Sequence, residues 1–453
     1  MSSTLRLFWE AAGGNVPEHW EFKTIDELLE HPKAISVGVM YPGSDSDGGV
    51  PLIKVSDVKS GAIASRPSFC ISNKVDEEYK RTRLNGSELL LTLVGNPGDC
   101  VIVTDEMCGW NVARALAVIR LKDTQLRSWI RYVLASKPAQ HLIEARLNTT
   151  VQKTLNLKDV REIGIPIPPK EERDSITKTI DSIEKKTLIN TKINQTLESI
   201  AQAIFKSWFI DFDPVRAKIA AKQNGEDPEL AAMCAISGKS EEELQQMPEE
   251  DLTELQATAA LFPDELVESE LGEVPKGWSI TKVDDILNRI KIKKRFKKND
   301  VNEFGRTFVL EQGSNVILGF HNEEGSIPAS KEEPAFIFGD HTCITKLMLS
   351  NFDVSENVIA VTGKERNSYW TYYAIKDLQK FQEYRRHWME LTSKQVVVAD
   401  INLTDYFAKK VKILHEEIEY SVRENLVLMN LRNTLLPKLL SGEMEVSILE
   451  GLS

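Results

Sequence analysis

Residues 176–208 follow a seam in which the spacing alternates between four and three, with no Gly or Pro to interrupt it. This spacing is typical of a long helix that packs along another helix in a coiled coil. The three polar residues in the middle of the seam would weaken nonspecific pairing and fix the register. The seam consists of Ile176, Ile180, Ile183, Thr187, Asn190, Asn194, Leu197, Ala201, Ile204 and Trp208.

The segment before this seam predicts the end of a strand and then the start of the helix. Ile165-Pro166-Ile167-Pro168-Pro169 cannot be helical throughout, because proline lacks a backbone donor and restricts the residue before it. Glu171 and Glu172 follow in the first turn of the expected helix, where the helix dipole favours negative charge.

A second seam with the same spacing lies near the C-terminus, and its start is expected near Glu416. Gly442 is expected to stop the helix, and Pro437 is expected to kink or fray the last turn. Two seams in one chain predict an antiparallel pair, although each helix could instead belong only to the core of its own half. A helix of about 38 residues spans about 57 Å, more than a domain of about 150 residues covers. The second seam consists of Ile418, Val422, Asn425, Met429, Arg432, Leu436 and Leu439.

The remaining segments predict mixed α/β domains. Strand-like apolar runs occupy residues 50–55, 88–94, 100–104 and 115–121, with counterparts at 307–310, 335–338 and 358–361. Helices are expected near residues 125–147 and 368–392. The predicted fold is therefore mixed α+β, with two globular domains per chain separated by a long antiparallel two-helix coiled coil.

An internal repeat supports this division. Gly14-Asn15-Val16-Pro17-Glu18-His19-Trp20 recurs as Gly272-Glu273-Val274-Pro275-Lys276-Gly277-Trp278, and residues 25–29 match 283–287 at the same offset. A later match joins residues 156–159 to 402–405. We therefore expect a first domain at 1–168, a central helix at 169–212, an acidic helical connector at 213–271, a second domain at 272–414, a distal helix at 415–445 and a tail at 446–453.

Charge is distributed unevenly along the chain, whose formal net charge is −12. Residues 225–273 hold 15 Asp or Glu and a single basic residue, Lys239. The remainder has 55 basic and 53 acidic residues, so it can present basic faces to phosphate. The acidic segment is either a solvated linker with short helices or a surface that docks a basic partner.

The sequence lacks the signatures of several classes of protein. No apolar run approaches a membrane span, the first residues do not resemble a signal peptide, and the five cysteines form no CxxC pair. No His/Cys cluster has zinc spacing, and neither a nucleotide-binding loop nor a methyltransferase motif with its cofactor turn is present. We expect a cytoplasmic, non-catalytic protein with reduced thiols and no metal of its own.

The strongest signal for nucleic-acid binding is a run of seven basic residues within ten, which begins at Arg289. Ile290, Ile292 and Phe296 interrupt the charges, so one side could pack while the other meets phosphates. A solvated strand or helix face is the alternative. The candidates for phosphate contact are Lys291, Lys293, Lys294, Arg295, Lys297 and Lys298.

A second candidate is a polar segment just before residue 156, whose small side chains suit hydrogen bonds to base edges and phosphates. A simple polar loop is the competing interpretation. The expected counterpart in the second half is the segment 392–395. These segments and scattered further positions supply the candidates Thr149, Thr150, Gln152, Lys153, Ser393, Lys394, Gln395, Arg81, Arg83, Asn96 and Arg114.

Taken together, these motifs resemble the specificity subunit of type I restriction–modification enzymes over nearly the whole chain. Four features carry the resemblance: the repeated Val-Pro-x-x-Trp opening, the proline-rich lead-in at 165–173, the segment Ala203-Ile204-Phe205-Lys206-Ser207-Trp208-Phe209-Ile210-Asp211-Phe212-Asp213-Pro214-Val215, and Leu435-Leu436-Pro437-Lys438-Leu439-Leu440-Ser441-Gly442. The acidic segment, and a second long helix without the proline lead-in, depart from the pattern.

The resemblance implies two target recognition domains, each reading one half of a bipartite, asymmetric site on double-stranded DNA. It implies that the two helices act as a ruler between the half-sites. It also implies two methyltransferase subunits, which bind S-adenosylmethionine, and motor–nuclease subunits, which use ATP and Mg, as partners. The chain itself would hold no cofactor and contact no membrane.

Two other functions remain open from the residues alone. A coiled-coil scaffold without base readout would tolerate neutralisation of the basic run, whereas a DNA reader would lose affinity. A single-chain methyltransferase would bind S-adenosylmethionine by itself. The missing cofactor motifs argue against this alternative.

Overall fold

A computed structural model describes residues 2–59, 61–63, 65–147, 153–313, 315–383 and 385–444 of the chain. The chain divides into two compact units. The first unit combines Met1–Lys185 with Leu428–Ser453, and the second comprises Lys186–Val427. Each unit therefore contains one part of each of the two long helices, α7 (Lys170–Phe209) and α15 (Ile401–Leu440).

The first unit is built on a four-stranded antiparallel sheet in the order β2-β10-β7-β8. Alternate residues of β7 face two different cores: Leu89 and Leu91 pack with helix α4, whereas Leu90 packs with the residues under the neighbouring small sheet. Because both faces are covered, these strands consist mostly of apolar residues. The strands are β2 (Ile35–Val37), β7 (Leu89–Thr92), β8 (Cys100–Ile102) and β10 (Leu116–Ile119).

A three-stranded sheet and two strand pairs complete the first unit. In the three-stranded sheet, β3 (Val50–Ile53) pairs antiparallel with β6 (Cys70–Ile71) and parallel with β9 (Asn111–Val112). The short strands β4 (Val58–Lys59) and β5 (Ala62–Ile63) pair with each other. The helices are α1 (Ser2–Ala11), α2 (Ile25–Leu28), α3 (Asn73–Glu78), α4 (Arg127–Ala135), α5 (Lys137–Glu144) and α6 (Leu157–Arg161).

The remaining pair explains the repeated opening motif. β1 (Glu21–Thr24) pairs antiparallel with β11 (Gly164–Ile167), the strand that leads into α7. Just before β1, the Trp20 indole N–H donates to the carboxylate of Glu172 in the first turn of α7. The motif therefore fastens the start of the domain to the start of the long helix.

The second unit repeats this topology. Its four-stranded antiparallel sheet has the order β15-β21-β18-β19, and its three-stranded sheet again combines an antiparallel pair, β16·β17, with a parallel one, β16·β20. β14 pairs with β22, the strand before α15, as β1 pairs with β11 before α7. The strands are β14 (Ser279–Lys282), β15 (Leu287–Arg289), β16 (Thr307–Leu310), β17 (Ile317–His321), β18 (Ala335–Gly339), β19 (Thr345–Met348), β20 (Asp353–Val354), β21 (Val358–Gly363) and β22 (Gln395–Val398).

The shared strand order confirms the predicted internal repeat and the mixed α+β fold. The helices of the second domain are α12 (Val283–Ile286), α13 (Ser368–Ile375) and α14 (Trp388–Ser393). None of the helices in the described ranges is long and apolar enough to cross a membrane.

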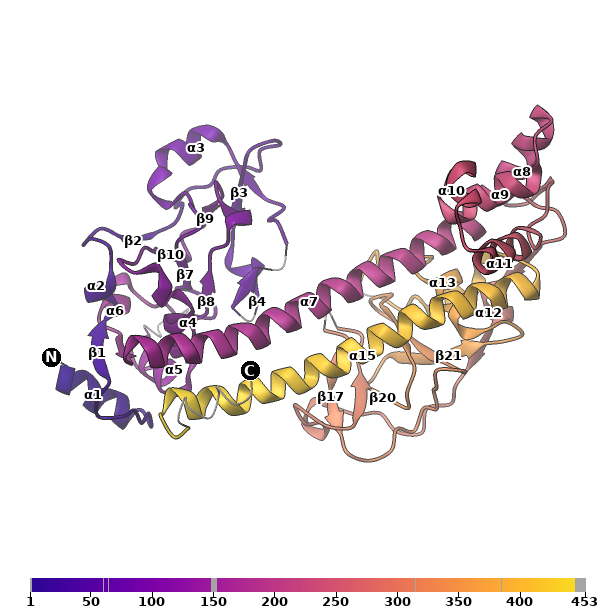
Figure 1. Ribbon diagram of the computed structural model, residues 1–453. Helices are drawn as coiled ribbons and strands as arrows, with labels where there is room; N and C mark the ends of the chain where they lie inside the picture. Colours follow the sequence, from indigo (N-terminus) through magenta and orange to yellow (C-terminus); the bar gives the residue numbers. More distant parts are fainter. Residues whose placement is uncertain are drawn as a thin grey trace. The chain divides into compact units, whose positions relative to one another are not determined.

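The two long helices pack against each other antiparallel within each unit (Figure 1). In the second unit, the Asn190 side-chain amide of α7 donates to Glu424 Oε2 at 2.6 Å and to Asn425 Oδ1 at 2.9 Å on α15. In the first unit, Arg432 of α15 bonds Glu184 of α7 at 3.4 Å. The two-helix pairing predicted from the seams is thus present in both units.

Helix α15 starts earlier than the predicted residue 415. Its first residue is Ile401, and the Asp400 carboxylate accepts a hydrogen bond from the backbone N–H of Asn402. Leu403 and Phe407 are fully buried in the core of the second unit. The spacing does not reveal these early turns, because their apolar residues face the domain core as well as the partner helix.

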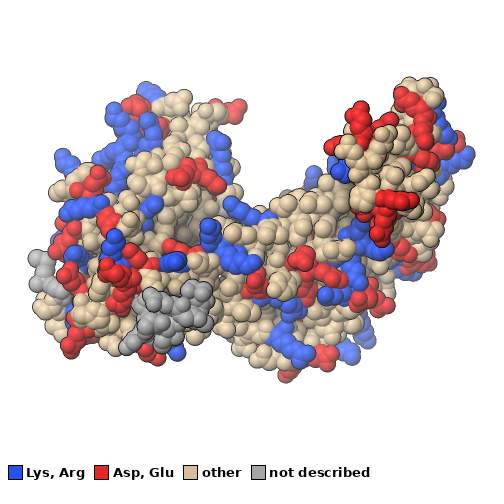
Figure 2. Space-filling view, viewed as in Figure 1, with Lys and Arg blue, Asp and Glu red and all other residues tan. Residues whose placement is uncertain are grey.

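The acidic connector forms a helical lobe with a small core of its own rather than an extended linker. Ala232, Met233, Leu244 and Ala259 form that core. Acidic side chains gather on the surface of the lobe (Figure 2). It consists of α8 (Asp213–Asn224), α9 (Pro228–Ser237), α10 (Glu241–Gln245) and α11 (Glu249–Ala259), followed by the hairpin of β12 (Leu266–Ser269) and β13 (Gly272–Pro275).

Candidate nucleic-acid interface

The basic run of the second unit lies at one end of the four-stranded sheet. β15 is antiparallel to β21 with Arg289 opposite Val361, so the chain after Arg289 runs toward the start of β21. β18 stops at the same end, where Gly339 pairs with Val358. We call this end, at which β18 stops and β21 begins, the loop end of the sheet.

Three contacts fix the basic run in place. The Arg295 guanidinium donates to the carbonyl oxygens of Ser355 at 2.7 Å and Val358 at 2.9 Å, and the backbone N–H of Phe296 donates to Val354 O. Burial lowers the pKa of Arg295, and the positive charge of Arg289 lowers it further. Arg295 therefore anchors the run through these hydrogen bonds, and its contact with phosphate stays a prediction.

The apolar and charged residues of the run separate as their alternation predicts. Ile290 and Ile292 pack against the core of the three-stranded sheet, and Phe296 is buried with its ring stacked on His321 at a centroid distance of 4.8 Å. The lysines of the run remain exposed: Lys291, Lys293, Lys294, Lys297 and Lys298. The run forms neither helix nor strand between residues 290 and 297, so its shape comes from these anchors.

The ring under Phe296 is itself held by a buried carboxylate. His321 Nε2 lies 2.9 Å from Asp353 Oδ2, and Asp353 also accepts a hydrogen bond from the Ser326 hydroxyl. Sequence reasoning missed this support, because a single histidine and a distant aspartate give no pattern along the chain.

A cationic hollow of about 360 Å³ opens beside the run. It is lined by Arg289, Ile290, Lys291, Ile292 and Arg295. The Arg289 guanidinium lies 5.8 Å from the centroid of the Trp388 ring, which holds it at the side of the hollow. Three cationic side chains around one hollow suit an anionic group such as a phosphate.

In the first unit, three of the candidate residues lie at the equivalent end of the sheet. Thr92, the last residue of β7, pairs with Leu116, the first residue of β10. Asn96 lies in the turn that follows β7, Arg114 just precedes β10, and Lys153 adjoins Thr154, which bridges to Val94. Asn96, Arg114 and Lys153 are all exposed. Thr149, Thr150 and Gln152 lie outside the described residues.

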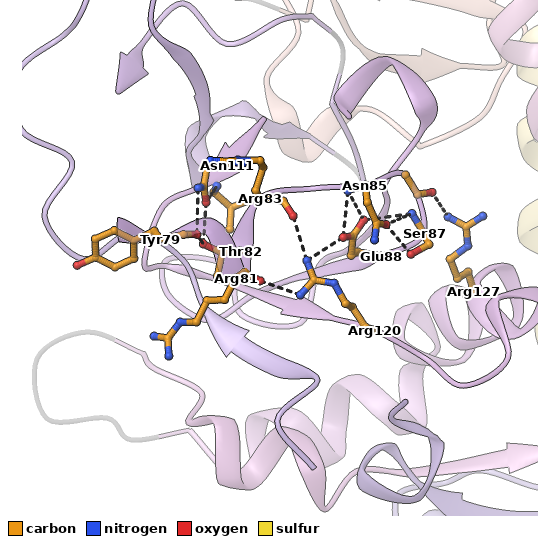
Figure 3. Close-up of polar contacts among 12 residues, drawn as sticks. Tyr79, Arg81, Thr82, Arg83, Asn85, Ser87, Glu88, Asn111, Arg120 and Arg127 are labelled. Atoms are coloured by element: carbon orange, nitrogen blue, oxygen red, sulfur yellow. Dashed lines mark hydrogen bonds and ion pairs between the residues drawn. The ribbon is translucent and has the colours of Figure 1, made fainter. Parts of the chain in front are cut away.

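Arg81 and Arg83 lie at the opposite end of that sheet, where their carbonyl oxygens contact Arg120 (Figure 3). Arg120, which follows the last residue of β10, donates to the carbonyl oxygens of both and to Glu88 Oε1 at 3.0 Å. Glu88 is fully buried and also accepts hydrogen bonds from the backbone N–H groups of Asn85 and Ser87. This network joins the segment to the end of β10.

The two arginines differ in how free their charge is. Arg83 forms ion pairs with Asp76 and Glu77, whose hydrogen bonds raise the pKa of its guanidinium. Arg81 is exposed, and its side chain points away from the network (Figure 3). Lys and Arg side chains also gather around α3 on the surface of this unit (Figure 2).

The side chains of Ser393, Lys394 and Gln395 bond within the second unit, at the end of α14 and the start of β22. Ser393 Oγ donates to Glu390 O at 2.9 Å, Lys394 Nζ donates to Leu378 O at 2.6 Å, and Gln395 Nε2 donates to Glu270 at 3.3 Å.

These residues are not the structural counterpart of the segment before residue 156, so the expected equivalence is wrong. α6 precedes β11 as α14 precedes β22, and residues 402–405 instead lie in the first turn of α15. Backbone contacts agree. Leu155 N–H donates to Leu93 O, just after β7, and His387 N–H donates to Asp340 O, just after β18, the strand equivalent to β7. The stretch before α14 therefore occupies the position in the second unit that Lys153 occupies before α6 in the first.

The predicted packing residues of the long helices differ in burial. In the first unit, Ile176 and Ile180 are buried, and Ile183 and Leu436 pack against the same core. In the second unit, Trp208 and Ile418 are buried, Ile204 and Val422 pack against core clusters, and Leu197 is partly buried. Met429 is 38% exposed.

No group of three or more His, Cys, Asp or Glu within the described ranges is placed to hold a metal ion. The two sheet ends offer exposed cations and hydrogen-bonding groups, and such groups bind anions and polar surfaces.

Comparison with known proteins places the chain in a family. A family model described as the type I restriction modification DNA specificity domain matches residues 17–199. The specificity subunit of the type I restriction enzyme HindI from Haemophilus influenzae is 31% identical over 344 residues, covering 67% of this chain and 73% of the relative. That of MjaIX from Methanocaldococcus jannaschii is 22% identical over 97% of this chain and 96% of the relative.

A solved structure shows the same fold. The type I restriction–modification system S subunit from M. genitalium superposes with a TM-score of 0.50 at 15% sequence identity, covering 93% of this chain and 96% of that one. The sequence relationship to the HindI subunit and the matching domain model agree with the motifs identified above. The chain belongs to the family of type I restriction enzyme specificity subunits.

Proposed function

We propose that each of the two units binds one half of a bipartite, asymmetric double-stranded DNA site through the loop end of its four-stranded sheet. The observation that carries this proposal is the repeat of topology without a repeat of residues. Both units bring exposed polar or basic residues to the same end of the same sheet: Asn96, Arg114 and Lys153 in the first, and the 289–298 run in the second. Equivalent frames with unlike side chains suit two different base sequences.

The charge distribution supports DNA as the ligand. Acidic residues are concentrated in the connector, so the domains are close to neutral overall and can carry local basic surfaces. Exposed lysines would neutralise phosphates, while Asn96 and Arg114 are of the residue types that read base edges.

We further propose that the long helices dock two methyltransferase subunits, which bind S-adenosylmethionine, and that motor–nuclease subunits with ATP and Mg join for restriction. In the second unit, Ile189, Ile193 and Ile200 are exposed on α7, and Ile413, Tyr420 and Val427 are exposed on α15. Their spacings place each set along one face of its helix. Such exposed apolar stripes are typical of surfaces that a partner covers. The chain would supply recognition and no catalytic group.

A domain exchange tests the proposal. Residues 20–160 would be replaced by those of a relative, and the chain would be expressed with its methyltransferase partners in a host whose methylome is sequenced. We expect one half of the methylated sequence to change and the other half to stay the same, because each domain reads its own half.

An unchanged methylated sequence would contradict the assignment of recognition to these domains. Restoration of the original residues 20–160 in the exchanged chain serves as the control and should restore the original sequence. A scaffold without base readout predicts no change in either direction.

A further inference from the structure

We propose that Arg386 and Met389, at the start of α14, form a second DNA-contacting element of the second unit, beside the basic run. This inference rests on the proposed function, because it names additional recognition residues for the same DNA site. No local sequence pattern points to these two residues, and the motif match points instead to the segment 392–395.

Topology places the start of α14 at the loop end of the sheet. His387 N–H donates to the carbonyl oxygen of Asp340 at 2.8 Å, and Asp340 directly follows β18. The Asp340 carboxylate also accepts a hydrogen bond from the backbone N–H of Trp388 at 2.9 Å. The start of α14 is therefore fixed to the strand end that borders the basic run.

The internal repeat gives independent support for this position. In the first unit, the equivalent contact from Leu155 N–H to Leu93 O fixes the chain just after the segment that contains Lys153. The polar side chains of that segment predict a DNA contact. The stretch that leads into α14 holds the position in the second unit that Lys153 holds in the first.

The side chains of Arg386 and Met389 are highly exposed to solvent. The Arg386 side chain is 79% exposed, and its ion pair with Asp340 is long, at 3.8 Å. Met389 is 76% exposed, although it lies on a helix next to the buried His387. An exposed guanidinium with one long ion pair, near a large exposed apolar side chain, contributes little to the core of the unit.

Side-chain hydrogen bonds anchor the backbone that presents them. The buried imidazole of His387 lies 3.2 Å from Glu390 Oε2 and 3.0 Å from Glu383 O, and Gln379 donates to the same Glu390 oxygen at 2.9 Å. Trp388 packs on Phe338 and carries the Arg289 guanidinium over its ring. Arg289, at the edge of the cationic hollow, thus links the basic run directly to α14.

The chemistry of the two side chains fits a DNA groove. A guanidinium can bind guanine through two hydrogen bonds or a phosphate through its charge, and an apolar side chain can contact the methyl group of thymine. We assign Arg386 to a guanine in the half-site read by the second unit and Met389 to a neighbouring base pair.

The test compares Arg386→Ala, Arg386→Lys and Met389→Ala in the full complex with methyltransferase partners. Binding to the wild-type recognition site and to sites substituted at each position of either half would be measured by fluorescence anisotropy between about 50 and 200 mM salt. Lys364→Ala is the matched control, because Lys364 is exposed and follows the opposite end of β21. Thermal unfolding would show that each variant is folded.

We expect Arg386→Ala to weaken binding to the correct site roughly 10-fold and to relax preference at one position of one half-site. Arg386→Lys should fail to restore that preference, because an ammonium group cannot form the paired hydrogen bonds. Met389→Ala should reduce discrimination at a neighbouring position, and Lys364→Ala should change neither.

Each contrary outcome has a distinct meaning. If Arg386→Lys restores full affinity and Arg386→Ala weakens all sequences equally, Arg386 contacts a phosphate and the guanine assignment is overturned. If both positions can be changed without effect while the wild-type complex reads a bipartite site, the inference fails and the proposed function stands. A wild-type complex with no sequence preference would overturn the proposed function itself.

Discussion

At the residue scale, one buried imidazole shows how the second unit depends on pH. His415 of α15 is buried, and its Nε2 lies 2.8 Å from the Tyr373 hydroxyl oxygen. Burial lowers the pKa of His415 to about 4. The nearby Glu198 carboxylate opposes that shift, while the Lys346 and Lys376 ammonium groups add to it. The imidazole is therefore neutral in the folded protein at neutral pH.

This lowered pKa predicts a loss of stability in mild acid. Above pH 6.5, His415 is neutral in both the folded and unfolded states, so its titration does not change the free energy of unfolding. Between pH 6.5 and 4 the unfolded chain takes up a proton that the folded chain does not, so the free energy of unfolding falls by at most about 3 kcal/mol. Urea unfolding at pH 7 and pH 5 measures the difference.

His415→Gln serves as the comparison, because glutamine keeps a polar partner for Tyr373 but does not titrate. The variant should lose clearly less stability than the wild type between the two pH values. An equal loss in both proteins would show that other groups control the acid response.

At the scale of the element, the seam between the long helices contains two asparagines with different surroundings. Asn190 is buried and its amide donates to Glu424 and Asn425, an interaction that lowers the pKa of the Glu424 carboxyl. The side-chain oxygen of Asn194, one turn later, is buried without a hydrogen-bond partner among the described residues. The sequence presented both as equivalent polar positions in one seam.

The two asparagines should therefore respond differently to the same substitution. Asn190→Leu removes the hydrogen-bond donor of Glu424 and Asn425 on α15 and should lower the free energy of unfolding by about 1–3 kcal/mol. Asn194→Leu removes an unsatisfied buried acceptor and should leave stability unchanged or raise it. Urea unfolding of the two variants, with the exposed Thr196→Ala as the control, measures both effects. Equal destabilisation by the two leucines would contradict this distinction.

At the scale of the whole molecule, a chain with a net charge of −12 is proposed to bind a polyanion. The connector confines much of the acidity to a helical lobe with its own core, whereas the 289–298 run presents exposed lysines on a separate part of the second unit. The number of phosphates that the protein neutralises sets the dependence of binding on salt, and the net charge of the chain does not.

Replacement of Lys291, Lys293 and Lys294 by Ala tests this separation. The slope of the logarithm of affinity against the logarithm of salt concentration should become shallower by about 0.9 for each phosphate that the variant no longer neutralises. Glu241, Glu242 and Glu243, replaced together by Gln, form the control and should leave the slope unchanged. A slope that follows net charge in both variants would overturn this account.

The sequence alone identified the features that arise from local spacing. The four-three seams predicted helices because neighbouring turns of one helix place those residues on a single face. The repeated Val-Pro-x-x-Trp motif marked two equivalent domain starts, and the 289–298 run was visible because its charges lie close together along the chain. Each of these signals lies within a short stretch of chain.

Only the tertiary structure decided which segments share a surface and which charges remain free. Strand pairing brings Arg289 opposite Val361 and places the start of α14 beside the end of β18, although no local pattern connects them. The folded structure also pairs Arg83 with Asp76 and Glu77, whereas the Arg386 side chain remains exposed. Helix periodicity is a short-range property of the chain, whereas sheet edges and ion pairs join residues that are distant along it, and these distant contacts set the candidate interface.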